Sequence, residues 1–231
     1  MVFNGFQKLT LLDYPGKVAC TLFTAGCNFR CPFCHNASLV THINDELVYS
    51  QDEVLSYLSK RQGLLDGVCI TGGEPLLHDE LEEFIVSLKS LGYLVKLDTN
   101  GSSPEKLKKL VNSSLIDYVA MDIKNCENKY SLTVGIKNFD ITKVKESVEF
   151  LLNSNSVDYE LRTTVVNELH NIEDIESVAK WISGAKRYFL QNFIDSGDLI
   201  GGGLSPVDPK KIKQMQTIAS KYVQNVEIRG V

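Results

Sequence analysis

Six short apolar segments rich in β-branched residues alternate with amphipathic segments along the chain, and this alternation constrains the fold more than any other feature of the sequence. The expected strands are residues 18–24, 68–71, 94–98, 118–123, 159–165 and 187–193. Between and after them, apolar residues recur at the i, i+3 and i+4 spacing of a half-buried helix, in residues 54–58, 81–88, 107–111, 144–152, 172–182 and 212–223. Strands separated by helices pair in parallel through right-handed crossovers. The sequence therefore predicts an α/β fold built on a parallel sheet.

The number of strand–helix units limits the possible architectures but does not decide between them. Six strand–helix units are fewer than the eight of a closed barrel, so an open doubly wound sheet and an incomplete barrel both fit the pattern. No repeat, low-complexity segment or linker rich in Pro, Gly and Ser divides the 231 residues. We therefore expect one domain over residues 1–231, with a loose glycine-rich loop at 196–207.

Composition excludes several classes of partner. The chain carries 24 Lys and Arg against 29 Asp and Glu, a net charge of −5, whereas non-specific binding of nucleic acid needs a basic surface. No apolar run approaches the ~20 residues of a membrane span. The first apolar patch contains Lys8 and Asp13 and does not resemble a signal peptide. We expect a cytoplasmic protein that binds neither nucleic acid nor membranes, in a compartment that keeps thiols reduced.

Three of the six cysteines crowd into eight residues, in the pattern Cys27-x3-Cys31-x2-Cys34. Thiolates select zinc or iron–sulfur centres over hard cations, so the triplet indicates a soft-metal site. A structural zinc ion normally takes four ligands, and no second Cys pair or His pair supplies the fourth. Three ligands without a fourth suggest a cubane iron–sulfur cluster with one iron left open.

The other cysteines and most histidines need no functional explanation. Cys20, Cys69 and Cys126 lie within or just after expected strands, where a buried small apolar side chain is the favoured interpretation. His42, His78 and His170 lie in expected loops or helix starts, and we expect them to be solvated.

Polar residues gather where the expected strands end. The cysteine loop, residues 26–36, follows the first strand, and the turns at 72–75 and 98–101 follow the second and third. Because the carboxyl ends of parallel strands meet on one side of either architecture, the sequence predicts one concave site. Taken alone, the Gly-Gly and Asn-Gly sequences also fit simple turns, and Asp122 with Lys124 also fits an ion pair.

Together these motifs carry a resemblance to a known family. The cysteine triplet followed by Thr71-Gly72-Gly73-Glu74-Pro75 resembles the radical S-adenosylmethionine (SAM) enzymes, in which a cysteine loop and this turn have the same order. Asp13-Tyr14-Pro15-Gly16, Cys34-His35-Asn36 and Asp98-Thr99-Asn100-Gly101 are similar to the activating enzymes of glycyl-radical enzymes. Within that group, residues 7–16 and 189–198 most resemble the proteins that activate anaerobic ribonucleoside-triphosphate reductases. The resemblance covers nearly the whole chain and implies a partial (β/α)6 barrel.

The resemblance also implies roles for individual residues. Cys27, Cys31 and Cys34 would bind three irons of one 4Fe–4S cluster, whose fourth iron would chelate the amino and carboxylate groups of SAM. Lys124 would lie near the sulfonium and joins the three cysteines in the catalytic set, and Phe33 would pack on the adenine. The residues expected to contact SAM are Phe33, Cys34, His35, Gly72, Gly73, Glu74, Asp98, Thr99, Asn100, Asp122, Lys124 and Arg162.

The chemistry of the side chains explains several of these expected contacts with SAM. The Gly72-Gly73 turn would let the backbone approach the ligand, and Glu74 would accept a hydrogen bond from the methionine ammonium. Asp98 and Asp122 would help to hold the methionine end, in some family members with a monovalent cation. Arg162 is costly to bury unpaired, so it is expected to meet an anion such as the ligand carboxylate.

The implied reaction is reductive cleavage of SAM to a 5′-deoxyadenosyl radical, which takes a hydrogen atom from a glycine Cα of a protein substrate. The implied partners are an anaerobic ribonucleoside-triphosphate reductase as substrate and a flavodoxin- or ferredoxin-like electron donor. Gln191-Asn192-Phe193 stands where activating enzymes of pyruvate formate-lyase have a His near the end of the sixth strand, which favours the reductase-activating branch.

Three alternatives remain open. The first is an activating enzyme of another glycyl-radical enzyme, such as pyruvate formate-lyase. The second is a radical SAM enzyme that modifies a small molecule. The third is a non-catalytic zinc or iron–sulfur module.

Overall fold

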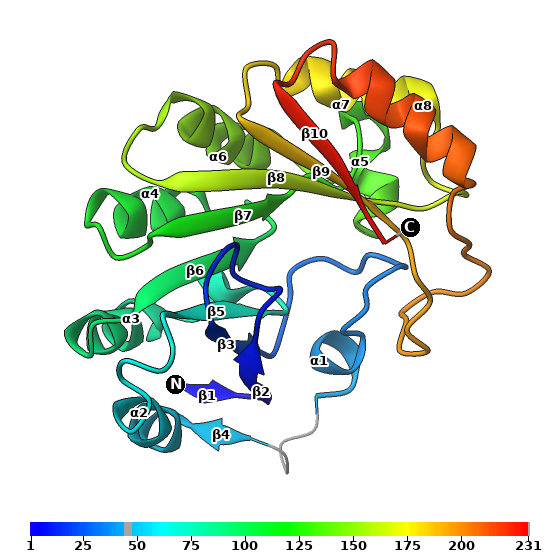
Figure 1. The fold of residues 1–231 in the computed structure, drawn as a ribbon. Helices are drawn as coiled ribbons and strands as arrows, with labels where there is room; N and C mark the ends of the chain where they lie inside the picture. Colours follow the sequence, from blue (N-terminus) through cyan, green and yellow to red (C-terminus); the bar gives the residue numbers. More distant parts are fainter. Residues whose placement is uncertain (44–47, 231) are drawn as a thin grey trace.

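A single large sheet organises the computed structural model, which describes residues 1–43 and 48–230 and so leaves a few positions of the expected domain outside the described residues. Its strands are β2 (Gly5–Thr10), β3 (Ala19–Thr24), β5 (Gly67–Gly72), β6 (Leu94–Thr99), β7 (Tyr118–Asp122), β8 (Asp158–Val165), β9 (Arg187–Asn192) and β10 (Asn225–Arg229). Their order in the sheet is β10-β9-β8-β7-β6-β5-β3-β2. The pairing of β2 with β3 is antiparallel, and the other neighbouring pairs are parallel. Figure 1 shows that the sheet curves and stays open between β2 and β10.

The six predicted strands are β3 and β5 to β9, each within one residue of its expected ends. They lie side by side in chain order, so the prediction of an α/β fold on a parallel sheet is confirmed. The two edge strands were not predicted. Gln7, Lys8 and Leu9 of β2 are all exposed, and β10 follows the last helix where no further unit was expected.

Six helices cover the outer side of the curved sheet (Figure 1). They are α2 (Gln51–Ser59), α3 (Leu81–Ser90), α4 (Pro104–Asn112), α6 (Thr142–Asn153), α7 (Ile172–Trp181) and α8 (Pro209–Ala219). All six were predicted, although α8 ends at Ala219 rather than at residue 223. Pro104 opens α4, and Asn171 caps α7 in a reciprocal capping box with Asp174.

Short elements fill the connections and were not predicted, because so few residues carry no readable period. They are β1 (Val2–Phe3), β4 (Tyr49–Ser50), α1 (Ser38–Thr41), the 3-10 helix η1 (Pro75–Leu77) and α5 (Glu127–Thr133). α1, η1 and α5 follow β3, β5 and β7, so they surround the carboxyl ends of the strands. In the described part of the chain, every helix is too short or too polar to cross a bilayer.

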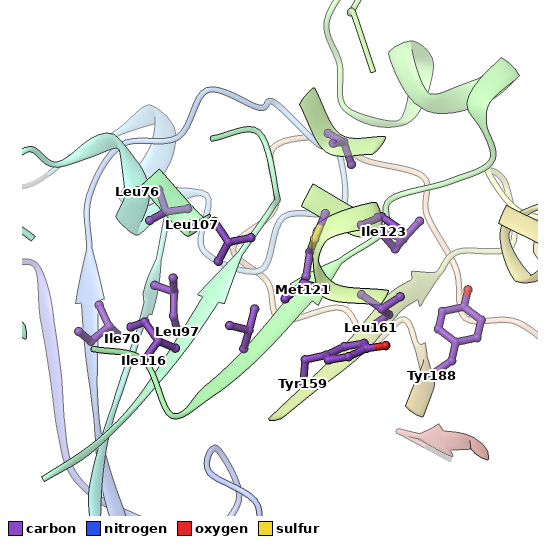
Figure 2. Close-up of a cluster of buried hydrophobic side chains, with 14 of the residues drawn as sticks. Ile70, Leu76, Leu97, Leu107, Ile116, Met121, Ile123, Tyr159, Leu161 and Tyr188 are labelled. Atoms are coloured by element: carbon purple, nitrogen blue, oxygen red, sulfur yellow. The ribbon is translucent and has the colours of Figure 1, made fainter. Parts of the chain in front are cut away.

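The two faces of the sheet have different chemistry because successive residues of a strand point to opposite sides. Ile70, Leu97, Met121, Leu161 and Tyr188 come from successive strands and form one buried apolar layer, shown in Figure 2. The residues that alternate with them line cavities on the other face and are mostly charged or polar: Lys96, Asp98, Asp122, Glu160, Arg162 and Gln191. The apolar layer therefore holds the helices, and the inner face is left for polar chemistry.

Candidate active site

The three clustered cysteines lie on the irregular loop between β3 and α1 and line one cavity of about 220 Å³. Cys31 is buried, and Cys27 and Cys34 are partly exposed. The loop has local hydrogen bonds, with the Phe29 N–H donating to Cys27 Sγ at 3.3 Å and the Cys34 N–H to the Cys31 carbonyl at 3.1 Å. Burial raises the pKa of the Cys31 thiol to about 12. A bound metal would lower this pKa and stabilise the Cys31 thiolate.

The cavity brings together every residue predicted for the cluster and for SAM except Glu74. The lining residues that were predicted are Cys27, Cys31, Phe33, Cys34, His35, Gly72, Gly73, Asp98, Thr99, Asn100, Asp122, Lys124 and Arg162. Thr164 and Gln191 also line it; Thr164 was not predicted, whereas Gln191 belongs to the segment singled out near the end of the sixth strand. Thr164 lies two residues after Arg162, so the period of two along β8 was the available signal for it.

The Gly72-Gly73 turn is required by contacts within the protein itself. Gly72 has a φ of +122°, and a Cβ there would lie 2.3 Å from the backbone of Thr24. A Cβ on Gly73 would lie 1.8 Å from the carbonyl oxygen of Gly26, at the start of the cysteine loop. The Gly73 N–H also donates to the Thr24 carbonyl at 2.9 Å. The two glycines therefore let the end of β5 pack directly against the chain that leads into the cysteine loop.

Glu74 is placed differently from the expectation. Its side chain is 1% exposed and is absent from the cavity lining. Its Oε1 accepts from the Thr99 hydroxyl at 2.8 Å and its Oε2 from the Asn100 N–H at 2.7 Å. The position of Glu74 therefore does not support a contact with the methionine ammonium. The carboxylate instead joins the Gly-Gly turn to the turn after β6.

A ladder of alternating charges, Lys96-Asp98-Arg162-Asp122-Lys124, crosses the inner face from β6 to the end of β7. Lys96 pairs with Asp98, and Arg162 bridges Asp98 at 3.2 Å and Asp122 at 2.9 Å. Lys124 contacts the other oxygen of Asp122 at 2.9 Å. Burial opposes ionisation of Asp122, but the charges of Arg162 and Lys124 outweigh it and lower its pKa to about 2. The anion expected for Arg162 is thus supplied by two carboxylates of the chain, and Lys96 was missed although it alternates with Asp98 on a buried strand.

The aromatic and histidine side chains around the cavity include one correction. Phe33 is buried, and the Lys124 ammonium lies 6.0 Å from the centre of its ring. His35 is exposed and stacks on Phe193 at 5.7 Å. His170 was expected to be solvated, but it is 2% exposed. Its ring is held by the Lys124 carbonyl at 2.9 Å and by the backbone of Val166, so it supports the chain behind Lys124.

The other histidines and cysteines differ in how far they are buried. His78 is half-buried, with its ring 3.0 Å from the Ala25 carbonyl, whereas His42 is exposed as expected. Cys20, Cys69 and Cys126 are buried, which confirms their interpretation as packing residues.

The donor set fits an iron–sulfur cluster better than a single metal ion. Within residues 1–43 and 48–230, no three His, Cys, Asp or Glu side chains converge closely enough for one ion. A cluster is different, because each cysteine binds a separate iron and the sulfurs lie farther apart. Three cysteines on one cavity wall therefore match a cluster with an iron left for a further ligand.

Comparison with known proteins agrees with this geometry. The sequence pattern described as the radical SAM superfamily matches residues 21–182 of the chain. The chain belongs to the radical SAM superfamily. As a radical SAM enzyme, the protein uses a 4Fe–4S cluster together with SAM.

Relatives of this radical SAM chain include proteins with different names. The chain is 33% identical to a Methanocaldococcus jannaschii protein named as a glycyl-radical enzyme activating enzyme, over 99% of the chain and 95% of the relative. It is 29% identical to the GTP 3′,8-cyclase of Helicobacter pylori, over 66% of the chain and 48% of the cyclase. The structure of Streptococcus suis SuiB bound to SAM has a TM-score of 0.69 at 13% identity, over 90% of the chain and 49% of SuiB. The chain thus spans about half the length of SuiB, whose likeness supports the radical SAM fold.

Proposed function

We propose that this radical SAM enzyme activates a glycyl-radical enzyme, and that its protein substrate is an anaerobic ribonucleoside-triphosphate reductase. The observation that carries the activating role is the alignment of 99% of the chain with a relative named for that role. The choice of reductase rests on residues 7–16 and 189–198, which most resemble reductase-activating proteins. Gln191 in the cavity wall, where a His is expected in the pyruvate formate-lyase branch, supports the same choice.

In this proposal Cys27, Cys31 and Cys34 hold three irons and leave the fourth for the amino and carboxylate groups of SAM. When bound, the cluster would supply one electron to the SAM sulfonium; the S–C5′ bond would break to give methionine and a 5′-deoxyadenosyl radical, which would take a hydrogen atom from a glycine Cα of the partner. The protein contributes the positioning of SAM and a cavity wall that carries fixed charges.

The charged ladder is suited to the methionine end of SAM. It contains three cations and two carboxylates, 3 − 2 = +1, and the excess positive charge complements the carboxylate of SAM. Asp98 and Asp122 line the same cavity and can accept hydrogen bonds from the ammonium. A monovalent cation beside these two carboxylates stays a prediction. Phe33 offers the adenine an apolar face beside Lys124.

A second cavity gives a protein substrate room to approach. It has a volume of about 630 Å³ and shares Asp98, Arg162 and Gln191 with the first cavity. Leu12, before β3, and Gly230, after β10, also line it, so it lies at the open side of the sheet (Figure 1). We assign this cavity to the partner segment that carries the glycine.

The cluster also needs an electron donor. The sequence contains no second cysteine triplet that could hold a relay cluster. We therefore propose that a flavodoxin- or ferredoxin-like protein reduces the cluster directly.

The alternatives have weaker support. A small-molecule role like that of GTP 3′,8-cyclase is less favoured, because the alignment with that relative covers 66% of this chain, whereas the alignment with the relative named as an activating enzyme covers 99%. A zinc module leaves the alignment with activating enzymes unexplained.

The proposal is tested by anaerobic reconstitution of the wild type, Cys31→Ala and the matched variant Cys126→Ala with iron and sulfide. We expect Cys31→Ala to lose both the visible absorption of the cluster and the release of 5′-deoxyadenosine from SAM. Cys126→Ala should keep both, since Cys126 lies on the outer side in a separate cavity with α6 and α7. Cleavage of SAM by Cys31→Ala would contradict the assignment.

A further inference from the structure

The two residues that flank Cys31 are both packed against glycines from distant parts of the chain. On one side, the Gly201 N–H donates to the Pro32 carbonyl at 2.8 Å. On the other side, the Arg30 N–H donates to the Val134 carbonyl at 2.8 Å, next to Gly135. The middle of the cysteine loop is therefore held from two directions.

Both contacts are too close for any other residue. A Cβ on Gly201 would lie 2.6 Å from Cβ of Pro32. A Cβ on Gly135, which has a φ of +68°, would lie 2.3 Å from the carbonyl oxygen of Arg30. Carbon atoms in normal contact lie roughly 3.5–4 Å apart, so either substitution must displace the neighbour of Cys31.

Gly201 belongs to a segment that follows the cysteine loop over some distance. Residues 193–201, here called the clamp segment, contain no helix or strand, and Figure 1 shows the chain after β9 beside the chain that leads into α1. Phe193 at its start stacks on His35. Asp198 in its middle accepts from the Ser38 N–H at 3.1 Å and the Ser38 hydroxyl at 2.8 Å.

The clamp segment thus contacts the cysteine loop at residues 32 and 35 and the start of α1 at residue 38. Three contacts along one stretch of chain resist its displacement more than one contact does, because each ordered contact lowers the entropy cost of the next. Part of the glycine-rich loop that looks loose in the sequence is therefore held against the residues that neighbour the proposed cluster ligands.

We propose that Gly201, with the clamp segment, and Gly135 are positioning residues for the cluster: they fix the backbone on both sides of Cys31 so that its thiolate faces the same cluster as the thiolates of Cys27 and Cys34. The inference rests on these three cysteines being the cluster ligands. Gly201 and Gly135 do not line the cavity and act through Pro32 and Arg30.

Two other glycines of the chain provide matched controls for the test. Gly202 adjoins Gly201, but a Cβ there meets nothing within 4 Å. Gly63 has a φ of +76°, close to that of Gly135, and also has open space around it. Gly202→Ala is therefore the control for Gly201→Ala, and Gly63→Ala, which introduces the same backbone strain without the contact, is the control for Gly135→Ala.

The measurement is the rate at which a chelator removes iron from the anaerobically reconstituted protein, together with the EPR spectrum of the reduced cluster. We expect Gly201→Ala and Gly135→Ala to release iron several-fold faster than their controls and to show an altered EPR line shape. Equal release rates and identical spectra in each variant and its control would overturn the proposal. Circular dichroism of the cluster-free proteins checks that the fold is present.

Should the alanine variants fail to fold, a second pair of milder substitutions tests the same proposal. Asp198→Asn weakens the contact with Ser38, whereas Asp195→Asn alters a carboxylate that accepts from Gly197 within the clamp segment. Faster iron release from Asp198→Asn than from Asp195→Asn supports the proposal, and equal rates contradict it. Loss of the cluster in Cys31→Ala with unchanged clamp variants would reject the clamp alone, while a cluster retained in Cys31→Ala would reject the ligand assignment.

Discussion

At the scale of single residues, the inner face of the sheet is dominated by buried charges that satisfy one another. Arg162 is 13% exposed and donates to two carboxylates from two different strands, Asp98 and Asp122. A planar guanidinium can do this because its donors are fixed in a fork. Its removal leaves two carboxylates that face each other in a poorly solvated place, and such losses are costly.

We predict that Arg162→Met lowers the free energy of unfolding of the cluster-free protein by roughly 3 kcal/mol. Arg162→Lys should recover about half of that loss, because one ammonium cannot bridge both aspartates. Lys106→Met removes the exposed partner of Asp79 and should cost less than ~1 kcal/mol. Urea unfolding measures all three. A loss for Arg162→Met no larger than that for Lys106→Met would show that the ladder adds no stability.

Glu74 leads to a prediction about pH. Burial raises its pKa from 4.5 to about 7 and outweighs the hydrogen bonds from Asn100 and Thr99. Between these two pKa values the folded chain keeps a proton that the unfolded chain has lost, so raising the pH through this window removes stability. The loss is at most ~1.4 kcal/mol per pH unit and ends above about pH 7.

Glu74→Gln should therefore flatten the fall in unfolding free energy between about pH 5 and about pH 7. Urea unfolding of the cluster-free wild type and variant at several pH values across that window measures the difference in slope. The same slope in both proteins would mean that Glu74 titrates normally in the folded state.

Glu74 and His170 also show which site residues a sequence pattern cannot place. The pattern located Glu74 at the end of a strand, but whether it faces the cavity or the next turn depends on the path of residues 98–101. His170 lies beyond the end of β8, and its burial depends on the packing of the chain after Lys124. These positions follow from tertiary contacts and not from local periodicity.

At the scale of helices and strands, local signals were sufficient wherever an element is long and one of its faces is buried. β3 and β5 to β9 were located because apolar residues run through them. β2 was missed because its central residues are exposed, and its pairing with β3 rests on backbone hydrogen bonds that any sequence can make. Edge strands are therefore where sequence prediction is weakest in this fold.

Two helix starts allow a direct test of capping. The Asn171 side chain accepts from the Asp174 N–H at 2.8 Å at the start of α7. Ser103 occupies the same position before α4 but forms no such side-chain bond. We predict that Asn171→Ala costs about 1 kcal/mol of unfolding free energy and Ser103→Ala less than ~0.5 kcal/mol. Thermal or urea unfolding checks the pair, and equal losses would contradict the capping account.

At the scale of the whole molecule, one cavity collects residues from loops and strands far apart in the sequence. Cys27 and Arg162 lie 135 positions apart in the chain (162 − 27), yet both line it. The sequence could predict this assembly because parallel strands deliver their carboxyl ends to one side of the sheet. The sequence could not predict the second cavity at the open side or the contacts of residues 193–201 with the cysteine loop. Both depend on tertiary contacts between segments that lie far apart in the chain.

The central claim is that a glycine of a protein partner receives the radical. The direct measurement is EPR after anaerobic mixing of the reduced, reconstituted enzyme, SAM and an anaerobic ribonucleoside-triphosphate reductase, with pyruvate formate-lyase in a parallel sample. The account predicts a glycyl radical signal on the reductase, absent without SAM and absent with Cys31→Ala, and little or none on pyruvate formate-lyase. A signal on pyruvate formate-lyase alone would move the enzyme to the other branch. SAM cleavage with no glycyl radical on either partner would contradict the activating function.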